Sequence, residues 1–334
     1  MTERVRVIQY GLGPIGSAIA RHVTERDGLA LVGAVDVDPE KAGREAGGVI
    51  GLGRPLGFPV TSTLGETLAR AQADVVLHTT SSYFDRFKPQ ILEILAAGLD
   101  IVSTAEELSF PWLAHPEEAA EVDAAARRMG TTVLGTGVNP GFVMDSLPLF
   151  LTAICQRVDR IEVRRAMNAS LRRGPFQAKI GAGLTVEAFN ARMAAGRMGH
   201  VGLPESVGMV FHTLGKTLAR YESEVEPVVA ERRIVTEFFD VAPGHVAGLK
   251  QTARAFASGG EFLTLTFLAA LDADEDRDTI KIDGVPSLEV TLKGTNGDLA
   301  TVAIAVNAIK RVREAAPGLA TMCDLSLVAA WAKH

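Results

Sequence analysis

The glycine-rich segment near the N-terminus constrains the fold of this chain more than any other feature. Gly11, Leu12, Gly13, Pro14, Ile15 and Gly16 match the pattern G-x-G-x-x-G. They follow a strand-like run at residues 4–10 and open a stretch, residues 14–25, in which apolar residues recur every four positions. A strand, a glycine turn and a helix in this order predict the first unit of a Rossmann fold that binds a dinucleotide.

Each glycine of the motif has a mechanical part in such a fold. Gly11 would permit the tight turn, Gly13 the close approach of a pyrophosphate, and Gly16 the close packing of the helix on the sheet. The helix N-terminus then offers N–H groups and a positive dipole end to the phosphates. A glycine turn without a ligand is the alternative, but the position between strand and helix favours the cofactor.

Asp36 lies twenty positions after Gly16, directly after a second strand-like run at residues 31–35. A carboxylate there accepts hydrogen bonds from the adenosine ribose hydroxyls and repels a 2′-phosphate. We therefore expect NAD rather than NADP as the cofactor, although Lys41 or Arg44 nearby would permit both. Considered alone, Asp36 would be a turn residue, and its register with the glycines favours the cofactor role.

The order of the other elements predicts two domains. Strand-like runs at residues 74–78, 100–104 and 131–135 alternate with helical stretches, as in a doubly wound parallel sheet. After residue 141, helices expected at 185–197 and 204–222 precede strands expected at 232–241, 262–271 and 288–293, as in an α+β domain with a mainly antiparallel sheet. The edges of such a sheet often pair between subunits. The glycine-rich segment 174–202 is either a mobile cover over a ligand or a surface connection.

We therefore expect an α/β protein with three parts. Residues 1–140 form the Rossmann domain, and residues 141–297 form an α+β domain for substrate and oligomerisation. Residues 298–334 form a C-terminal helical segment that packs back on the Rossmann domain, with an amphipathic helix at 298–315 that ends before Pro317.

Composition excludes several classes of protein. The net charge of −6 does not favour nucleic acid, and no stretch has the character of a signal peptide or a membrane span. Cys155 and Cys323 are too few for a disulfide framework, which predicts a cytoplasmic protein with reduced thiols. The seven histidines show no metal-binding spacing and no G-x-S-x-G elbow is present, so we expect neither a metal nor a serine nucleophile.

Two polar groups follow strands of the predicted parallel sheet, at the edge where ligands bind in doubly wound folds. Thr79, Thr80 and Ser81 come after the strand at 74–78, and their hydroxyls are candidates to contact the nicotinamide ribose or, equally, to cap a helix. Asn139 and Pro140 come after the strand at 131–135. Asn139 is a candidate to orient the nicotinamide carboxamide, and a plain interdomain hinge is the alternative.

Glu106 and Glu107 follow the strand at 100–104 at the same edge. Ser103 with Glu106, or Thr104 with Glu107, fits the S/T-x-x-E capping box, and only one of the two can be the cap. The other glutamate would be free to face the nicotinamide. Glu106 is the weakly preferred candidate, as the second helical residue after a Thr104 cap.

Four segments together resemble the dihydrodipicolinate reductase-like group that contains 2,4-diaminopentanoate dehydrogenase and the native amine dehydrogenases. They are residues 9–16 (QYGLGPIG), 103–108 (STAEEL), 137–145 (GVNPGFVMD) and 317–325 (PGLATMCDL), and the last two are the most specific. The histidine-rich catalytic segment of true dihydrodipicolinate reductases is absent from the sequence.

The resemblance implies reversible oxidative deamination, in which an amine, NAD(P)+ and water give a ketone or aldehyde, ammonia and NAD(P)H. It places the family's catalytic glutamate within the Glu106–Glu107 pair, where an anion would hold and deprotonate the substrate nitrogen. Phe142, Met144 and Phe176 would supply apolar walls, with ordinary core packing as the alternative. No arginine or lysine stands out as a clamp for a substrate carboxylate, which slightly favours a simple amine over a diamino acid. A homodimer is expected.

Two other functions fit the glycine motif. An alcohol or semialdehyde oxidoreductase similar to homoserine dehydrogenase would turn over without ammonia. A protein that binds NAD(P)H only to sense it would show no turnover, and its glutamates would be helix caps.

Overall fold

The computed structural model describes residues 4–196 and 198–331. The chain divides into two compact units. Unit 1 contains the residues up to Phe142 together with those from Asn296 onward, and unit 2 is the continuous segment Val143–Thr295. Unit 1 is therefore built from both ends of the chain. The boundaries expected from the sequence lie after residues 140 and 297.

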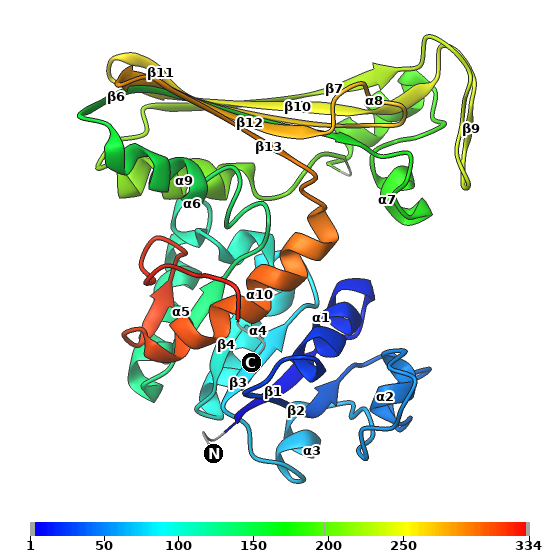
Figure 1. The fold of residues 1–334 in the computed structure, drawn as a ribbon, viewed down its shortest axis with the longest axis vertical. Coiled ribbons are helices and arrows are strands. Elements are labelled where there is room, and N and C mark those ends of the chain that lie inside the picture. Colours follow the sequence, from blue (N-terminus) through cyan, green and yellow to red (C-terminus); the bar gives the residue numbers. More distant parts are fainter. Residues whose placement is uncertain (1–3, 197, 332–334) are drawn as a thin grey trace. The chain divides into compact units, whose positions relative to one another are not determined.

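Unit 1 contains a parallel sheet with helices on both faces (Figure 1). The strand order is β14-β5-β4-β3-β1-β2, and every neighbouring pair is parallel. The expected Rossmann architecture is confirmed. Its strands are β1 (Val5–Tyr10), β2 (Leu29–Val35), β3 (Val75–His78), β4 (Asp100–Ser103), β5 (Thr132–Gly135) and β14 (Gly318–Ala320).

Two apolar cores cover the two faces of this sheet. Alternate residues of each strand point to opposite faces, so Val76 and Ile101 join one core while Val75 and Val102 join the other. α4 (Phe84–Ala96) and α5 (Pro116–Met129) pack on the first face, and α1 (Pro14–Thr24) and α10 (Gly297–Glu314) on the second. The shorter helices of unit 1 are α2 (Ala46–Val49), α3 (Leu64–Leu68), η1 (Glu106–Leu108) and η2 (Pro111–Leu113).

The C-terminal part of unit 1 adds more than a helix. α10 packs against α1, and the chain then forms β14, which pairs in parallel with β5. Gly318 begins this strand directly after Pro317. The sequence predicted only a helical segment here, because three residues are too short to show a strand pattern.

Unit 2 contains a second six-stranded sheet with the order β13-β12-β6-β11-β10-β7. Only β6 and β11 pair in parallel, so the expected mainly antiparallel sheet is confirmed. Its strands are β6 (Arg157–Asn168), β7 (Arg220–Val229), β10 (Val246–Ala257), β11 (Gly260–Ala270), β12 (Arg277–Val285) and β13 (Leu288–Lys293). Its helices are α6 (Ser146–Leu151), η3 (Thr152–Ile154), α7 (Gly174–Lys179), α8 (Val186–Ala194) and α9 (Leu203–Thr213).

Several elements of unit 2 differ from the prediction. The helix expected at 204–222 ends at Thr213, because Gly215 adopts the left-handed conformation (φ 62°), and the chain enters β7 at Arg220. The strand expected at 232–241 is a small hairpin of β8 (Ile234–Val235) and β9 (Asp240–Val241). The helix expected at 185–197 ends at Ala194, and residue 197 itself lies outside the described residues. Strands β6, β7, β10 and β12 were not among the elements expected from the sequence.

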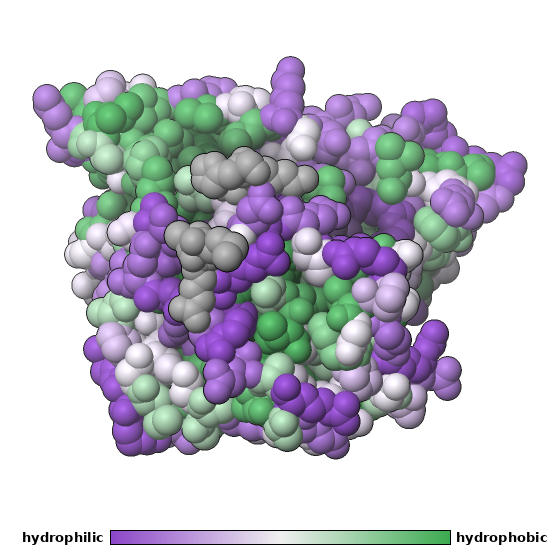
Figure 2. All heavy atoms as spheres, turned by 60° about the horizontal axis from the view of Figure 1, so that its bottom comes forward, coloured by the Kyte–Doolittle hydropathy of each residue, from purple (hydrophilic) through white to green (hydrophobic). Residues whose placement is uncertain are grey.

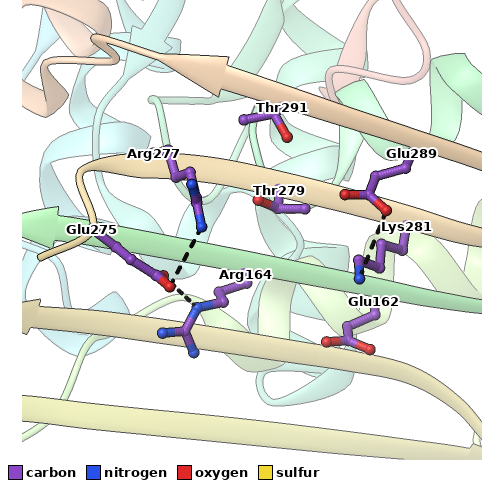
Figure 3. A pocket seen from close by; sticks show the side chains of 8 residues that line it. All are labelled: Glu162, Arg164, Glu275, Arg277, Thr279, Lys281, Glu289 and Thr291. Atoms are coloured by element: carbon purple, nitrogen blue, oxygen red, sulfur yellow. Dashed lines mark hydrogen bonds and ion pairs between the residues drawn. The ribbon is translucent and has the colours of Figure 1, made fainter.

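One face of the unit 2 sheet is polar and open. β6, β12, β13 and the turn before β12 form a hollow of about 290 Å³ on it (Figure 3). Glu275 accepts a hydrogen bond from Nε of Arg164 at 2.9 Å and lies 3.5 Å from Arg277, while Lys281 lies 3.7 Å from Glu289. Because these opposite charges pair with one another, the hollow is a solvated surface rather than an apolar pocket.

The molecular surface carries both hydrophobic and hydrophilic residues. On the face drawn in Figure 2, hydrophobic patches are surrounded by hydrophilic residues. Within the described part of the chain, no helix combines the length and the apolar character that crossing a bilayer requires.

Candidate functional site

The glycine motif forms a tight turn between β1 and α1, and neighbouring side chains hold it in shape. Gly11 has φ 91°, a conformation that disfavours residues with a Cβ. Thr79, directly after β3, donates its hydroxyl to the carbonyl oxygen of Gly11 at 2.8 Å. Gln9 on β1 donates to the same carbonyl at 3.0 Å and to Oγ1 of Thr79 at 2.8 Å. The loop is therefore fixed by protein contacts.

The space around the motif fits a dinucleotide. A Cβ on Gly16 would overlap the carbonyl oxygen of Gly11 and the hydroxyl of Thr79, so Gly16 is required for close packing. A Cβ on Gly13 would meet nothing within 4 Å. Gly13 is the N-cap of α1 and Pro14 follows at its first position, so the open space lies at a helix N-terminus, where phosphate groups bind.

Asp36 lies directly after β2 and is only 8% exposed. Its Oδ2 accepts a hydrogen bond from the backbone N–H of Leu12 at 2.7 Å, and its Oδ1 accepts one from the N–H of Asp38 at 2.9 Å. The carboxylate therefore joins the end of β2 to the glycine loop. Nζ of Lys41 lies 3.1 Å from Asp36 and 3.3 Å from Asp38. Burial lowers the pKa of Lys41, but the two neighbouring carboxylates raise it by more. Lys41 therefore stays a cation beside Asp36.

The hydroxyls after β3 have separate roles. Oγ1 of Thr80 donates to Gln90 at 2.6 Å, and Oγ of Ser81 accepts from the N–H of Tyr83 at 3.2 Å. Ser81 and Ser82 are not the N-cap of α4, because that residue is Tyr83. His78, at the end of β3, is fully buried between Ser103 and Gln90, and burial lowers its pKa to about 4.

The two adjacent glutamates have different surroundings. Oε2 of Glu107 accepts a hydrogen bond from the N–H of Phe84 at 2.5 Å, at the first turn of α4, and lies 3.4 Å from Nε2 of His115. Glu107 thus caps α4 across space. The carboxylate of Glu106 has no hydrogen-bond or ion-pair partner within the described ranges 4–196 and 198–331.

The predicted capping box around these glutamates is wrong. Glu106–Leu108 is a single 3₁₀ turn whose N-cap is Ala105, without a side-chain cap. Oγ of Ser103 instead accepts from the N–H of Ala105 at 3.1 Å and contacts His78 at 2.9 Å. Glu106 is therefore the first residue of the turn rather than the second.

The remaining predicted residues are divided between the two units. Asn139 and Pro140 follow β5 and are joined by a cis peptide bond, and Asn139 is 8% exposed. Phe142 is the last residue of this part of unit 1. In unit 2, Met144 is fully buried. The guanidinium of Arg172 lies over the ring of Phe176 on α7, and its Cζ atom is 5.0 Å from the centre of that ring.

Comparison with protein families identifies the chain. Residues 142–334 match the 2,4-diaminopentanoate dehydrogenase C-terminal domain, and residues 5–102 match the N-terminus of dihydrodipicolinate reductase. The 2,4-diaminopentanoate dehydrogenase of Acetoanaerobium sticklandii is 31% identical over 97% of this chain and 94% of its own length. The chain belongs to the 2,4-diaminopentanoate dehydrogenase family. The resemblance noted in the sequence is confirmed.

The chain is also similar to two amine dehydrogenases. An amine dehydrogenase of Streptomyces virginiae is 23% identical over 97% of this chain and 96% of its own length. The solved structure of the amine dehydrogenase from Mycobacterium smegmatis is 25% identical and covers 98% of both chains, with a TM-score of 0.87. This member of the 2,4-diaminopentanoate dehydrogenase family is an NAD(P)-dependent oxidoreductase with a Rossmann domain.

Sequence reasoning missed two charged residues in unit 2. Arg165 on β6 and Asp278 on β12 lie next to each other in the sheet and are 2% exposed each. The sequence contained a signal of this burial. Arg165 lies two positions after Val163 and four after Ile161, so it falls on the apolar face of β6. Among the described residues, no group of three or more histidine, cysteine or acidic side chains is arranged to hold a metal ion.

Proposed function

We propose that this chain is an amine dehydrogenase that oxidatively deaminates an amine or a diamino acid, with Glu106 as its catalytic carboxylate. The main supporting observation is that the Glu106 carboxylate has no hydrogen-bond or ion-pair partner among the described residues, while its neighbour Glu107 caps α4. Family membership supports the activity, since relatives are named 2,4-diaminopentanoate dehydrogenase and amine dehydrogenase.

The reaction needs a group that can bind a cationic nitrogen and exchange protons with it. The balanced reaction converts R₂CH–NH₂, NAD(P)+ and water into R₂C=O, NH₃, NAD(P)H and H⁺. A free carboxylate at Glu106 would hold the iminium and take a proton from the water that attacks its carbon. Bound NAD(P)+ supplies the hydride acceptor. Gly11, Gly13 and Gly16 with Thr79 and Asp36 would hold it in the loop described above.

Several finer assignments belong to this proposal. Leu12, Pro14 and Ile15 would offer the backbone of the turn and first helical turn to the pyrophosphate, and Thr80 and Ser81 would lie beside the nicotinamide ribose. Asn139 and Pro140 would contact the nicotinamide carboxamide. The apolar walls of the substrate site would come from Phe142, Met144 and Phe176.

We also propose that NAD is preferred and NADP is tolerated. Support comes from Asp36, whose carboxylate would face the ribose hydroxyls, and from Lys41, which neutralises part of its charge 3.1 Å away. A homodimer formed through unit 2 is supported by its open sheet face, on which Arg160 and Lys281 alternate with acidic residues and so present complementary charges. A cytoplasmic location agrees with Cys155 and Cys323, which form no disulfide among the described residues.

The test compares Glu106→Gln with its matched control Glu107→Gln. NADH formation from 2,4-diaminopentanoate and from simple secondary amines is followed at saturating NAD+. Glu106→Gln should lower kcat by roughly 10²–10⁴ without weakening NADH binding, because it removes the proton acceptor. Glu107→Gln should keep most of the activity and lower the thermal midpoint, because it weakens a helix cap.

Two outcomes would overturn the proposal. Full activity of Glu106→Gln would exclude the carboxylate mechanism. Ammonia-independent oxidation of alcohols, with no turnover of any amine, would instead indicate an alcohol or semialdehyde oxidoreductase.

A further inference from the structure

The 3₁₀ turn that carries Glu106 is held by its backbone, while the Glu106 carboxylate has no partner within the part of the chain that the structure describes. The N–H and the hydroxyl of Ser109 both donate to the carbonyl oxygen of Glu106, at 3.1 and 2.7 Å. On the other side, the N–H of Ala105 donates to Oγ of Ser103 at 3.1 Å. The main chain is therefore fixed before and after Glu106, and with it the direction in which the side chain leaves the turn.

This turn is also buried against the parallel sheet. A Cβ on Gly135 of β5 would lie 2.4 Å from the carbonyl carbon of Leu108 and 2.5 Å from the nitrogen of Ser109. Ser103 is fully buried, and Ala105 is 2% exposed. A buried N–H without an acceptor is costly, because water cannot replace the missing bond. The hydroxyl oxygen that Ser103 offers to Ala105 is therefore needed to keep the turn in place.

His78 contacts the same hydroxyl from the neighbouring strand. It is fully buried and in register with Ser103 across β3 and β4, and its Nδ1 lies 2.9 Å from Oγ of Ser103. Its Nε2 lies 2.8 Å from Oε1 of Gln90 and 2.9 Å from Oγ1 of Thr80. The Thr80 hydroxyl donates its own hydrogen to Gln90, so both neighbours of Nε2 are acceptors. Nε2 therefore carries the ring hydrogen.

This tautomer sets the direction of the next two hydrogen bonds. Burial lowers the pKa of His78 to about 4, so the ring is neutral at neutral pH and Nδ1 carries no hydrogen. Nδ1 therefore accepts from the Ser103 hydroxyl, and a lone pair of Oγ is left for the N–H of Ala105. Donors and acceptors match at each step from Gln90 on α4 to the residue before Glu106.

We propose that His78 and Ser103 are positioning residues for the Glu106 carboxylate, and that they act on the reaction through the 3₁₀ turn. This inference rests on the proposed function, in which Glu106 exchanges protons with the substrate. A carboxylate whose backbone is fixed before the substrate binds needs little reorganisation during the reaction. A small displacement of such a group lowers the rate by a large factor.

The first arm of the test is a double-mutant cycle. Ser103→Ala and Glu106→Gln are made singly and together, and kcat is measured with the best amine substrate found in the test above. Ser103→Ala alone should lower kcat by roughly 10–100-fold and change NADH affinity by less than about twofold. In the Glu106→Gln background it should lower kcat by less than about twofold, because no carboxylate is left to position. A role in folding alone would give the same factor in both backgrounds.

A matched control separates positioning from loss of stability. Thr67→Val also removes a buried hydroxyl from unit 1, one that contacts Thr61 and the carbonyl oxygen of Thr63. It should lower the thermal midpoint as Ser103→Ala does, and change kcat by less than about twofold. Circular dichroism and NADH titration establish that each protein is folded.

The second arm changes His78 and leaves Ser103 in place. An asparagine amide reaches the position of Nδ1 and can accept from Ser103, whereas a glutamine amide reaches the position of Nε2 and leaves Ser103 without that acceptor. His78→Asn should therefore keep most of kcat, and His78→Gln should lower it by roughly tenfold. Nitrogen NMR of the unmodified protein, with His78→Gln to assign the signals, should show the hydrogen on Nε2.

The outcomes separate this inference from the proposed function. Equal losses from Ser103→Ala in both backgrounds would overturn the positioning role and leave amine dehydrogenation standing. A hydrogen on Nδ1 of His78, or better activity of His78→Gln than of His78→Asn, would likewise exclude His78 from that role. Full activity of Glu106→Gln would instead show that the proposed carboxylate is wrong, and the inference would fail with it.

Discussion

The two units bury polar side chains in different ways. In unit 1, Thr79 and Asp36 make hydrogen bonds of 2.7–2.8 Å to the backbone of the glycine loop, and His78 has partners on both ring nitrogens. In unit 2, Nη1 of Arg165 and Oδ2 of Asp278 lie 3.7 Å apart, and neither buried atom has a hydrogen-bond partner among the described residues. The first arrangement gives a stretch of backbone a fixed shape. The second leaves part of the hydrogen-bonding capacity of two buried charges unused.

The largest expected effect concerns the charge pair in unit 2. Arg165→Met or Asp278→Asn alone should lower the free energy of unfolding by about 3–5 kcal/mol, because each strands a buried charge or a buried polar group. Arg165→Met/Asp278→Leu should cost much less than the sum of the two. Urea unfolding of the three variants measures the coupling. Additive effects would mean that the two side chains do not depend on each other, and the contrast between the units would disappear.

The buried histidine of unit 1 should give the next largest effect. The folded pKa of His78 is about 4 against an ordinary 6.5, so below pH 6.5 the unfolded chain binds a proton that the folded chain does not. The stability of unit 1 should therefore fall by about 3 kcal/mol between pH 6.5 and pH 4. Urea midpoints across this range measure the slope. His78→Gln should remove this contribution, and an unchanged slope in that variant would assign it to other groups.

The glycine loop offers a matched pair of substitutions. Gly16→Ala should destabilise unit 1 by about 1–3 kcal/mol, since the added methyl group overlaps the carbonyl oxygen of Gly11. Gly13→Ala should leave stability unchanged and weaken NADH binding by roughly tenfold, because its methyl group enters the space expected for the pyrophosphate. Thermal midpoints and fluorescence titration with NADH separate the two. Equal NADH affinity of Gly13→Ala and the unmodified protein would show that the cofactor lies elsewhere.

The smallest expected effect concerns Lys41. Lys41→Ala should weaken NADP binding by roughly fivefold and leave NAD binding nearly unchanged, because it removes a partly exposed cation beside Asp36. Titration of both cofactors gives the ratio, with Arg44→Ala as the control for a more exposed cation. A loss of NAD affinity equal to the loss of NADP affinity would show that Lys41 acts by orienting Asp36 instead.

The sequence revealed unit 1 better than unit 2 for a physical reason. Strands of a covered parallel sheet are short apolar runs separated by helices, so β1, β3 and β5 stand out. In unit 2, half of the twelve residues of β6 are charged, and this charge concealed the strand. The helix α9 was expected to continue past Thr213, because the following residues favour a helix. Gly215, in its left-handed conformation, ends the helix in spite of that composition.

Some residues of the candidate site could likewise be predicted from the sequence, and others could not. The glycines and Asp36 could be recognised because the spacing of the motif reflects a local turn. The different surroundings of Glu106 and Glu107 could not be predicted, because the group that occupies Glu107 is the N–H of Phe84, twenty-three positions away. Arg165 and Asp278 are separated by more than a hundred residues and meet only through the register of β6 and β12.

The way in which unit 2 interrupts unit 1 has a consequence for synthesis. Unit 2 is one continuous segment, so all of it is synthesised before α10 and β14. Until those residues emerge, the parallel sheet lacks the strand next to β5, and α1 lacks the helix that covers its side of the sheet. The nascent chain therefore completes its inserted part before its nucleotide-binding part, and a stalled or truncated product would expose the apolar surface that α10 normally covers.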